Sequence, residues 1–233
     1  MVNIFESLQI KAPFLKALND EKYETPTPIQ KKCIPKVLDG LDILGIAQTG
    51  TGKTAAFSIP ILQLLNGSQP ENKRRSTRAL ILAPTRELSI QIGSSVRLYG
   101  KYIAFKHTLI YGGVGQKPQV EALKRGVDLI IATPGRLLDL INQGYCKLDK
   151  IEFFVLDEAD RMLDMGFIND VKKIVKVIPK KRQTLFFSAT MPAAVESLAS
   201  NLLYKPEQIS IKPSSTPVEK ISQLVCFVRA EDK

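Results

Sequence analysis

The stretch that decides the fold runs from Asp42 to Thr54 and reads DILGIAQTGTGKT. Its first part, DILGIA (42–47), is a short and almost unbroken apolar run, as is typical of a strand buried on both faces. A turn rich in glycine follows, and from Lys53 to Leu65 the apolar residues recur at helical spacing. A strand, a glycine-rich loop and a helix in this order form the setting of a phosphate-binding loop (P-loop).

The loop itself offers the groups that a nucleotide triphosphate needs. Gly50 and Gly52 let backbone N–H groups turn inward around phosphate oxygens, and the start of the helix adds further free N–H donors. Lys53 reaches the β- and γ-phosphates as a point charge, and the Thr54 hydroxyl is a Mg²⁺ ligand. The simplest P-loop pattern starts with glycine, whereas this chain has Ala47. The predicted nucleotide-binding loop comprises Ala47, Gln48, Thr49, Gly50, Thr51, Gly52, Lys53 and Thr54.

Further apolar runs of the same kind follow along the chain. They are ALILA (79–83), HTLIY (107–111), DLIIA (128–132), FFVL (153–156), TLFF (184–187) and QISI (208–211). Helical patterns lie between them, at 28–39, 53–65, 86–101, 135–142, 167–177 and 193–203. This alternation predicts an α/β fold with a mostly parallel central sheet and helices on both of its faces. The polar segments 67–77 and 212–220 are predicted to be loops.

An acidic segment follows one of these runs directly. Asp157, Glu158, Ala159 and Asp160 come after FFVL, and the carboxyl ends of parallel strands face the ligand crevice of such a sheet. We therefore expect Asp157 to share Mg²⁺ with Thr54, and Glu158 to orient or deprotonate a water for attack on the γ-phosphate. Seen alone, the segment would be an acidic helix N-cap.

Composition excludes several classes of protein. Among 233 residues, 33 are Lys or Arg and 23 are Asp or Glu, and the formal charge of +10 favours a polyanionic partner. A solvated basic surface without a partner is the alternative. Three scattered cysteines and the single His107 indicate neither a disulfide framework, a zinc site nor a His-based triad. The lack of a signal peptide or membrane-length apolar run predicts a cytoplasmic protein without membrane contact.

The spaced motifs resemble the DEAD-box RNA helicases over residues 1 to about 220, with DEAD at 157–160. The segment YETPTPIQ (23–30) is similar to the Q motif of this family. The resemblance implies a RecA-like fold, with Gln30 reading the adenine edge, Tyr23 stacking on the ring, and Thr25 assisting. Phe5 matches an isolated upstream aromatic residue of the family's adenine site.

Three more segments are similar to the family's RNA-contacting motifs, PTREL (84–88), GG (112–113) and TPGR (133–136). The RNA-binding residues implied are Pro84, Thr85, Arg86, Gly112, Gly113, Gln116, Thr133, Pro134, Gly135 and Arg136. Such groups suit contacts to the RNA backbone that carry little sequence information. Ser188, Ala189 and Thr190 match the motif that couples hydrolysis to strand separation, with a hydrogen bond to Asp160 expected. The alternative for residues 188–190 is a purely structural role as the N-cap of the helix that follows them.

The resemblance also predicts the domain organisation. Residues 1–212 are expected to form the first RecA-like domain, with the Q motif within about 1–31. Residues 213–233 are expected to be a linker and the start of a second RecA-like domain that this monomeric chain lacks. We therefore expect weak nucleotide binding and almost no hydrolysis by the chain alone. The VEKISQLV junction (218–225) is similar to the RhlE-like branch of the family.

Other readings remain open at this point. A small-molecule kinase would leave the Q-motif, PTREL and TPGR segments without a purpose. A DNA helicase shares the same phosphate contacts. A non-catalytic, ATP-gated RNA clamp would not need Asp157 and Glu158.

Overall fold

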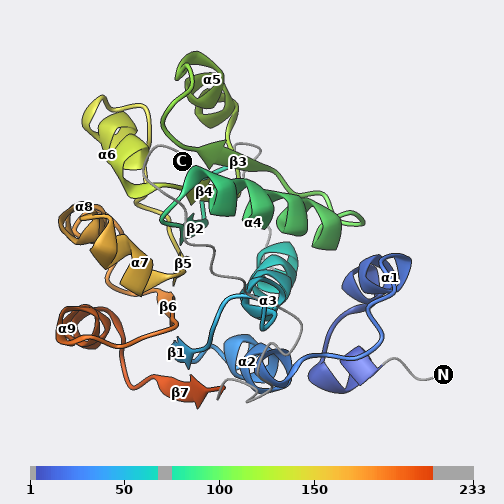
Figure 1. The fold of residues 1–233 in the computed structure, drawn as a ribbon. Coiled ribbons are helices and arrows are strands. Elements are labelled where there is room, and N and C mark those ends of the chain that lie inside the picture. Colours follow the sequence, from blue (N-terminus) through green and yellow to red (C-terminus); the bar gives the residue numbers. More distant parts are fainter. Residues whose placement is uncertain (1–3, 68–74, 212–233) are drawn as a thin grey trace, which may run out of the picture.

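A single parallel sheet organises the chain. The computed structural model describes residues 4–67 and 75–211. The sheet has seven strands in the order β3-β4-β2-β5-β6-β1-β7, and all the pairings are parallel. The strands are β1 (Ile43–Ile46), β2 (Ala79–Leu82), β3 (His107–Ile110), β4 (Leu129–Ala132), β5 (Phe153–Leu156), β6 (Gln183–Ser188) and β7 (Glu207–Ser210). The predicted α/β fold with a mostly parallel sheet is therefore confirmed (Figure 1).

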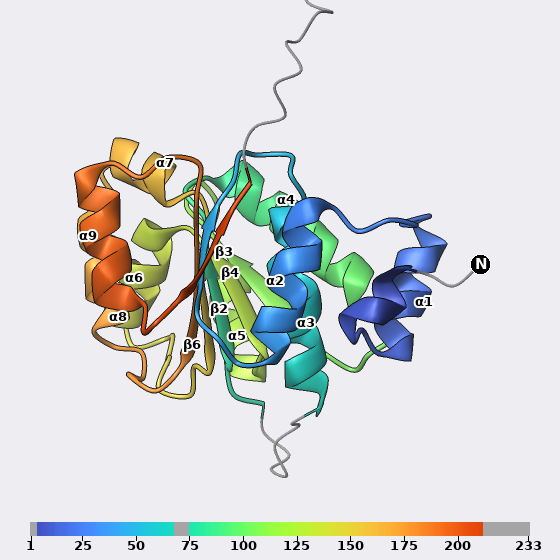
Figure 2. The ribbon, with the colours of Figure 1, turned by 90° about the horizontal axis from the view of Figure 1, so that it is seen from below.

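Helices cover both faces of the sheet, as Figure 2 shows in an edge-on view. One layer holds η1 (Ile4–Leu8), α1 (Ala12–Asp20), α2 (Pro28–Leu38), α3 (Lys53–Gly67) and α4 (Arg86–Tyr99). The other holds α5 (Lys117–Arg125), α6 (Pro134–Asn142), α7 (Ala159–Asp164), α8 (Ile168–Val175) and α9 (Ala193–Leu202). None of the helices in the described residues has the length and apolar character needed to cross a bilayer.

The apolar runs of the central strands β2, β4 and β5 are unbroken because these strands contribute side chains to two cores, whereas the edge strands β3 and β7 are each buried at one residue only. In β2, Ala79 and Ile81 belong to the core beneath α1–α4, whereas Leu80 and Leu82 belong to the core beneath α5–α9. Successive side chains of a strand point to opposite faces, so both sets must be apolar. All four are at most 1% exposed.

The sequence patterns missed four elements, η1, α1, α5 and α7, and set several boundaries a residue or two too wide. The missed helices are short, and α7 has only 6 residues. In α5 only Gln119 and Val120 are buried, too few to produce an apolar stripe. The start of α2 at Pro28 was predicted correctly, and Gly40 follows its end with φ of 81°.

Two predicted loops fall wholly or partly outside the described residues, since the description omits 68–74 and 212–233. The proposed linker and the ISQLV segment lie there, and so does Cys226. Cys33 and Cys146 are both buried and free, and burial raises the pKa of each thiol to about 12. His107 lies on the edge strand β3, stacked on Phe105 with ring centroids 5.3 Å apart.

Candidate nucleotide and RNA site

The strand order sorts the motif loops into two groups along the carboxyl edge of the sheet. Because all strands are parallel, every loop that follows a strand emerges at this edge. The loops after β1, β6 and β5 carry residues 47–54, 188–190 and 157–160, and we call them the P-loop half. The loops after β2, β4 and β3 carry 84–88, 133–136 and 112–116, and we call them the arginine half. Each group comes from adjacent strands.

In the P-loop half, Lys53 is folded onto its own loop. Its Nζ donates to the Ala47 carbonyl at 2.9 Å and lies 3.9 Å from Asp157 Oδ1, and the residue is only 5% exposed. The side chain is thus buried within the loop that was predicted to bind the phosphates. The ammonium group has three donors, and the bond to Ala47 uses one of them.

The Q-motif segment packs directly on the P-loop. Gln30 Oε1 accepts the Thr27 N–H at 2.9 Å, and Gln30 Nε2 donates to the Gly52 carbonyl at 3.2 Å. Gly52 has φ of 94°, and a Cβ there would lie 2.6 Å from Gln30 Nε2. Glycine at this position is therefore required both by the backbone and by the close approach of the glutamine.

The aromatic residues expected at the adenine differ in their exposure. Tyr23 is 42% exposed, and its ring makes a T-shaped contact with that of Tyr99, with ring centroids 6.4 Å apart. Thr25 is exposed beside it in the chain. Phe5 is only 1% exposed and belongs to the core beneath α1–α4. Its burial gives it a packing role, and we leave it out of the nucleotide site proposed below.

Asp157 is buried at the end of β5. It is 2% exposed, and its Oδ1 accepts the Glu158 N–H at 3.0 Å. Burial raises the pKa of Asp157 to about 6, against the opposing charge of Lys53. The half-buried Thr54 follows Lys53 at the start of α3.

Glu158 is held against the P-loop rather than against its own helix. Its backbone is left-handed, with φ of 53°, and its side chain makes no capping bond to α7. Instead, Thr49 Oγ1 donates to Glu158 Oε1 at 2.9 Å, and Arg161 Nη1 lies 3.4 Å from Oε2. Glu158 therefore has no N-capping role, and the left-handed backbone directs the carboxylate to the site. A non-glycine residue in this conformation carries strain, which is common at functional positions.

Between these loops, the expected hydrogen bond to Asp160 is present. Thr190 donates to Asp160 Oδ2 from its N–H at 2.8 Å and from its hydroxyl at 2.9 Å. The Asp160 N–H in turn donates to Ser188 Oγ at 3.2 Å. Although burial alone would raise the pKa of Asp160, the bonds from Thr190 hold it below its ordinary value. The N-cap of α9 is Pro192, so the alternative that residues 188–190 cap this helix is wrong.

The arginine half is open and joined by long side chains. Thr85 caps α4 by accepting the Leu88 N–H at 3.2 Å, and Pro84 beside it is buried. The exposed Arg86 places its guanidinium 5.2 Å from the centroid of the Tyr111 ring. A Cβ added to Gly113 would lie 3.8 Å from Arg86 Nη1. The PTREL and GG segments therefore face each other.

The TPGR segment is tied to the same glycine-rich loop. Arg136 Nη1 donates to the Val114 carbonyl at 3.2 Å, and the amides of Gln116 and Gln143 bond to each other. Gly112 is exposed, and a Cβ there would meet nothing within 4 Å. Thr133 is the N-cap position of α6, with Pro134 and Gly135 in its first turn. The three loops thus form one open surface. It carries the guanidinium groups of Arg86 and Arg136 and the exposed backbone of Gly112 and Gly113.

Three partners in the site were not expected from the sequence. The Tyr111 ring contacts the Arg86 guanidinium, the Gln143 amide forms a hydrogen bond with that of Gln116, and the Tyr99 ring contacts the Tyr23 ring. Tyr111 directly precedes Gly112, so its place in the chain was a usable signal. Tyr99 and Gln143 lie at helix ends far from the motifs and gave none.

A parallel sheet with a P-loop after β1 and an acidic strand end at β5 defines a P-loop NTPase of the RecA-like class. The sequence profile described as "DEAD/DEAH box helicase" matches residues 27–198, and the chain belongs to this family. It is 45% identical over 98% of its length to the ATP-dependent RNA helicase DeaD of Escherichia coli K12. It is 40% identical over its whole length to the DEAD-box ATP-dependent RNA helicase CshA of Bacillus subtilis.

These relatives are longer proteins, since the chain spans 38% of DeaD and 46% of CshA. The solved structure of a DEAD box protein from the hyperthermophile Methanococcus jannaschii superimposes with a TM-score of 0.83. That match has 41% identity and covers 89% of this chain and 56% of the other. The fold and the family are thus established, whereas the RhlE-like branch stays a prediction.

Proposed function

We propose that this chain is the nucleotide- and RNA-binding domain of an ATP-dependent RNA helicase. In the whole protein, ATP binding and hydrolysis would drive local unwinding of an RNA duplex. The contiguity of the motif loops carries the proposal: one half of the carboxyl edge suits a nucleotide, and the adjoining half suits a polyanion. The two halves meet where β5 and β2 pair, so a change at the nucleotide lies next to the RNA surface.

ATP is assigned to the P-loop half. Residues 47–54 bind the phosphates, and Gln30 pairs with the adenine edge through its amide, which excludes guanine. Tyr23 stacks on the base, and Thr25 lies at the same side. The bond from Gln30 to Gly52 supports this assignment, because it joins the base-reading residue to the phosphate-binding loop.

Mg²⁺ is assigned to Asp157 and Thr54, and the residues present fit it. A buried carboxylate and a hydroxyl are oxygen ligands of the kind that Mg²⁺ takes, together with waters and substrate phosphates. The raised pKa of Asp157 indicates a carboxylate without enough compensating charge, which a cation would supply. When bound, the ion would neutralise charge on the phosphates.

Hydrolysis is assigned to Glu158, which orients or deprotonates the attacking water. Its bond to Thr49 ties it to the P-loop, so entry of a phosphate into that loop would alter the position of the carboxylate. Ser188, Ala189, Thr190 and Asp160 form the bonded link between the DEAD segment and β6, and we assign them to coupling. We further propose that residues 1–212 form one RecA-like domain of a cytoplasmic enzyme whose second such domain completes the site.

RNA is assigned to the arginine half, where Arg86 and Arg136 contact phosphates and Gly112 and Gly113 offer backbone N–H groups. Thr85, Gln116, Thr133 and Gly135 complete this surface, and the predicted Pro84 and Pro134 are buried beneath it. Contacts of this kind bind the RNA backbone without reading sequence. RNA is favoured over DNA where the 2′-OH is contacted.

A competition experiment tests the proposal. A fluorescent adenine nucleotide is titrated with the chain in the presence of Mg²⁺, with ATP, GTP and UTP as competitors. Displacement by ATP alone is expected, whereas equal displacement by all three would leave only a generic P-loop protein. Labelled single-stranded RNA is then titrated with unlabelled RNA and DNA of the same sequence, and equal competition would favour a DNA helicase.

A further inference from the structure

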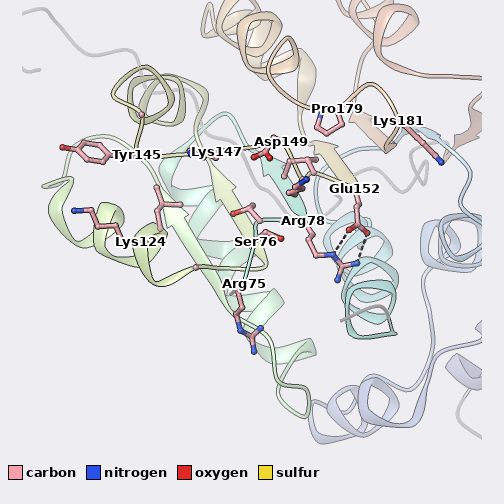
Figure 3. Close-up of a pocket in the computed structure, with 16 residues that line it drawn as sticks. Arg75, Ser76, Arg78, Lys124, Tyr145, Lys147, Asp149, Glu152, Pro179 and Lys181 are labelled. Atoms are coloured by element: carbon pink, nitrogen blue, oxygen red, sulfur yellow. Dashed lines mark hydrogen bonds and ion pairs between the residues drawn. The ribbon is translucent and has the colours of Figure 1, made fainter. Parts of the chain in front are cut away.

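A second group of basic side chains lies at the amino edge of the sheet, opposite the motif loops. Residues 75–78 precede β2, Gly126 precedes β4, residues 149–152 precede β5, and Lys181 precedes β6. Together with Lys124 and the segment around Tyr145 they line a groove (Figure 3), which we call the amino-edge groove. Strands of four residues separate it from the carboxyl edge, a distance of roughly 13 Å.

The charge of this groove is strongly unbalanced. Its lining includes six basic side chains and two acidic ones. Glu152 is engaged by the buried Arg78, which makes two bonds to it at 2.7 and 2.8 Å, and Arg75 is paired with Asp128. These pairs account for the two arginines.

Four exposed lysines of the groove, by contrast, have no carboxylate partner within residues 4–67 and 75–211. They are Lys124, Lys147, Lys150 and Lys181. Asp149 is the one remaining acidic group among them. Like charges gathered in a groove raise the local concentration of a polyanion.

The other groups of the groove favour a nucleic acid over an acidic peptide. Tyr145 is 43% exposed at the rim, and Lys124 Nζ lies 5.9 Å from its ring centroid. Ser76 and Thr77 add hydroxyl groups to the lining. Unpaired ammonium groups beside an accessible aromatic ring are the combination by which proteins hold single strands, with phosphates on the cations and a base on the ring. A polyglutamate segment could pair its carboxylates with the lysines, but it has no planar group to stack on the Tyr145 ring.

We propose that the amino-edge groove is a second RNA-binding site, which holds the backbone of single-stranded RNA with Tyr145 as a stacking platform. The ligand is taken from the proposed function, so the inference rests on it. Because the groove lies at the opposite end of the strands from the P-loop, RNA bound there is insensitive to nucleotide. Such a site would keep an RNA strand attached while the carboxyl edge releases it.

The test is a charge reversal with a matched control. Lys147→Glu combined with Lys150→Glu changes the groove, and Lys31→Glu combined with Lys32→Glu makes the same change of charge on the exposed side of α2. A fluorescently labelled 20-nucleotide oligouridylate is titrated with each protein at several KCl concentrations, without nucleotide. At about 0.1 M salt the groove variant should bind on the order of tenfold more weakly than the control. Its salt slope should also fall by about 1.4, because each lost contact to a single strand removes about 0.7.

A second variant removes the ring and keeps the charge. Tyr145→Ala should weaken binding about fivefold or more, consistent with the loss of one stacked base, and Tyr145→Phe should retain it. Thermal unfolding of every variant verifies that these exposed positions leave the fold unchanged. Equal RNA affinity of the groove variant and its control would overturn the inference.

The outcomes separate this inference from the proposed function. If Arg86→Ala with Arg136→Ala weakens RNA binding but the groove variant does not, the inference falls and the proposed function stands. If the wild-type chain binds no RNA at low salt, both fall. If the groove variant loses affinity for polyglutamate but not for RNA, the groove belongs to an acidic protein partner, and the inference is again overturned.

Discussion

The two halves of the carboxyl edge differ in how they are prepared for a ligand. In the P-loop half, Lys53, Asp157 and Glu158 are 5%, 2% and 7% exposed. Lys53 donates to Ala47 of its own loop, Asp157 accepts the Glu158 N–H, and Glu158 accepts from Thr49 of the neighbouring loop. In the arginine half, Arg86 and Gly112 are exposed, and Arg136 joins two of the loops by a bond to the Val114 carbonyl. The P-loop half is therefore closed by bonds between its own groups, whereas the arginine half is open at the surface. Substitutions in the first half should change both stability and binding, and those in the second half should change binding alone.

The largest effect is expected for Lys53→Ala. The loss of a charged donor to the phosphates should weaken nucleotide binding about 100-fold, since hydrogen bonds from such a group contribute roughly 3 kcal/mol to the binding free energy. Because Lys53 also faces Asp157 in a buried site, the free energy of unfolding should fall as well. Nucleotide titration and urea unfolding measure the two effects, with Lys172→Ala, at an exposed position of α8, as control. Unchanged nucleotide affinity would remove the P-loop assignment.

Two neighbouring glycines allow a sharper test of the packed P-loop half. Gly52→Ala places a Cβ 2.6 Å from Gln30 Nε2 at φ of 94°, whereas Gly50→Ala meets nothing within 4 Å at φ of 84°. Backbone strain of about 1–2 kcal/mol is common to both, and the clash should add about 1–3 kcal/mol to Gly52→Ala alone. If urea unfolding showed the same decrease in unfolding free energy for Gly52→Ala and Gly50→Ala, Gln30 would not be packed on the P-loop.

Asp157→Asn tests burial of charge in the same half. The folded pKa is raised from 3.8 to about 6, so the unfolded chain loses its proton first and stability is lost as the pH rises between these values. At pH 7.5 the asparagine variant should therefore be more stable than the wild type, by up to about 3 kcal/mol. Near pH 4 the difference should nearly vanish.

Urea unfolding at the two pH values measures this effect, and Asp164→Asn, at an exposed position of α7, is the control. Mg²⁺-dependent nucleotide binding by the wild type should also weaken as the pH falls through about 6, as Asp157 takes up a proton. If the difference in unfolding free energy between Asp157→Asn and the wild type did not change with pH, Asp157 would be ionised over the whole range.

The smallest effect is expected in the arginine half. Arg86→Ala and Arg136→Ala should each weaken RNA binding about tenfold through the loss of a phosphate contact, and leave nucleotide affinity unchanged. Unfolding free energies should change by less than about 1 kcal/mol, because neither guanidinium is fully buried. Arg97→Ala, on an exposed position of α4 away from the edge, is the control for charge. A loss of nucleotide affinity in either variant would contradict the assignment of nucleotide and RNA to separate halves of the carboxyl edge.

Much of this protein was predictable from local sequence patterns. Short apolar runs predicted the parallel sheet, because a strand buried on both faces leaves no alternation. The GKT of residues 52–54 and the DEAD of residues 157–160 follow β1 and β5, as the order of strand, loop and helix in the sequence predicted. Their roles as phosphate and metal ligands stay predictions. The bond from Thr190 to Asp160, which is present, was expected from the family resemblance of residues 188–190 and not from a local pattern.

Only the tertiary structure decided how these groups are held. The burial of Phe5, the closure of Lys53 onto Ala47, and the bond from Thr49 to Glu158 depend on contacts between segments distant in the chain. The amino-edge groove likewise joins residues 75–78 with 147–152 and Lys181, which no single stretch of sequence brings together. Local patterns determine which chemical groups are present, because backbone preference and hydrophobic period act over a few residues. Strand order and packing determine which of them are buried, paired or left open to a ligand.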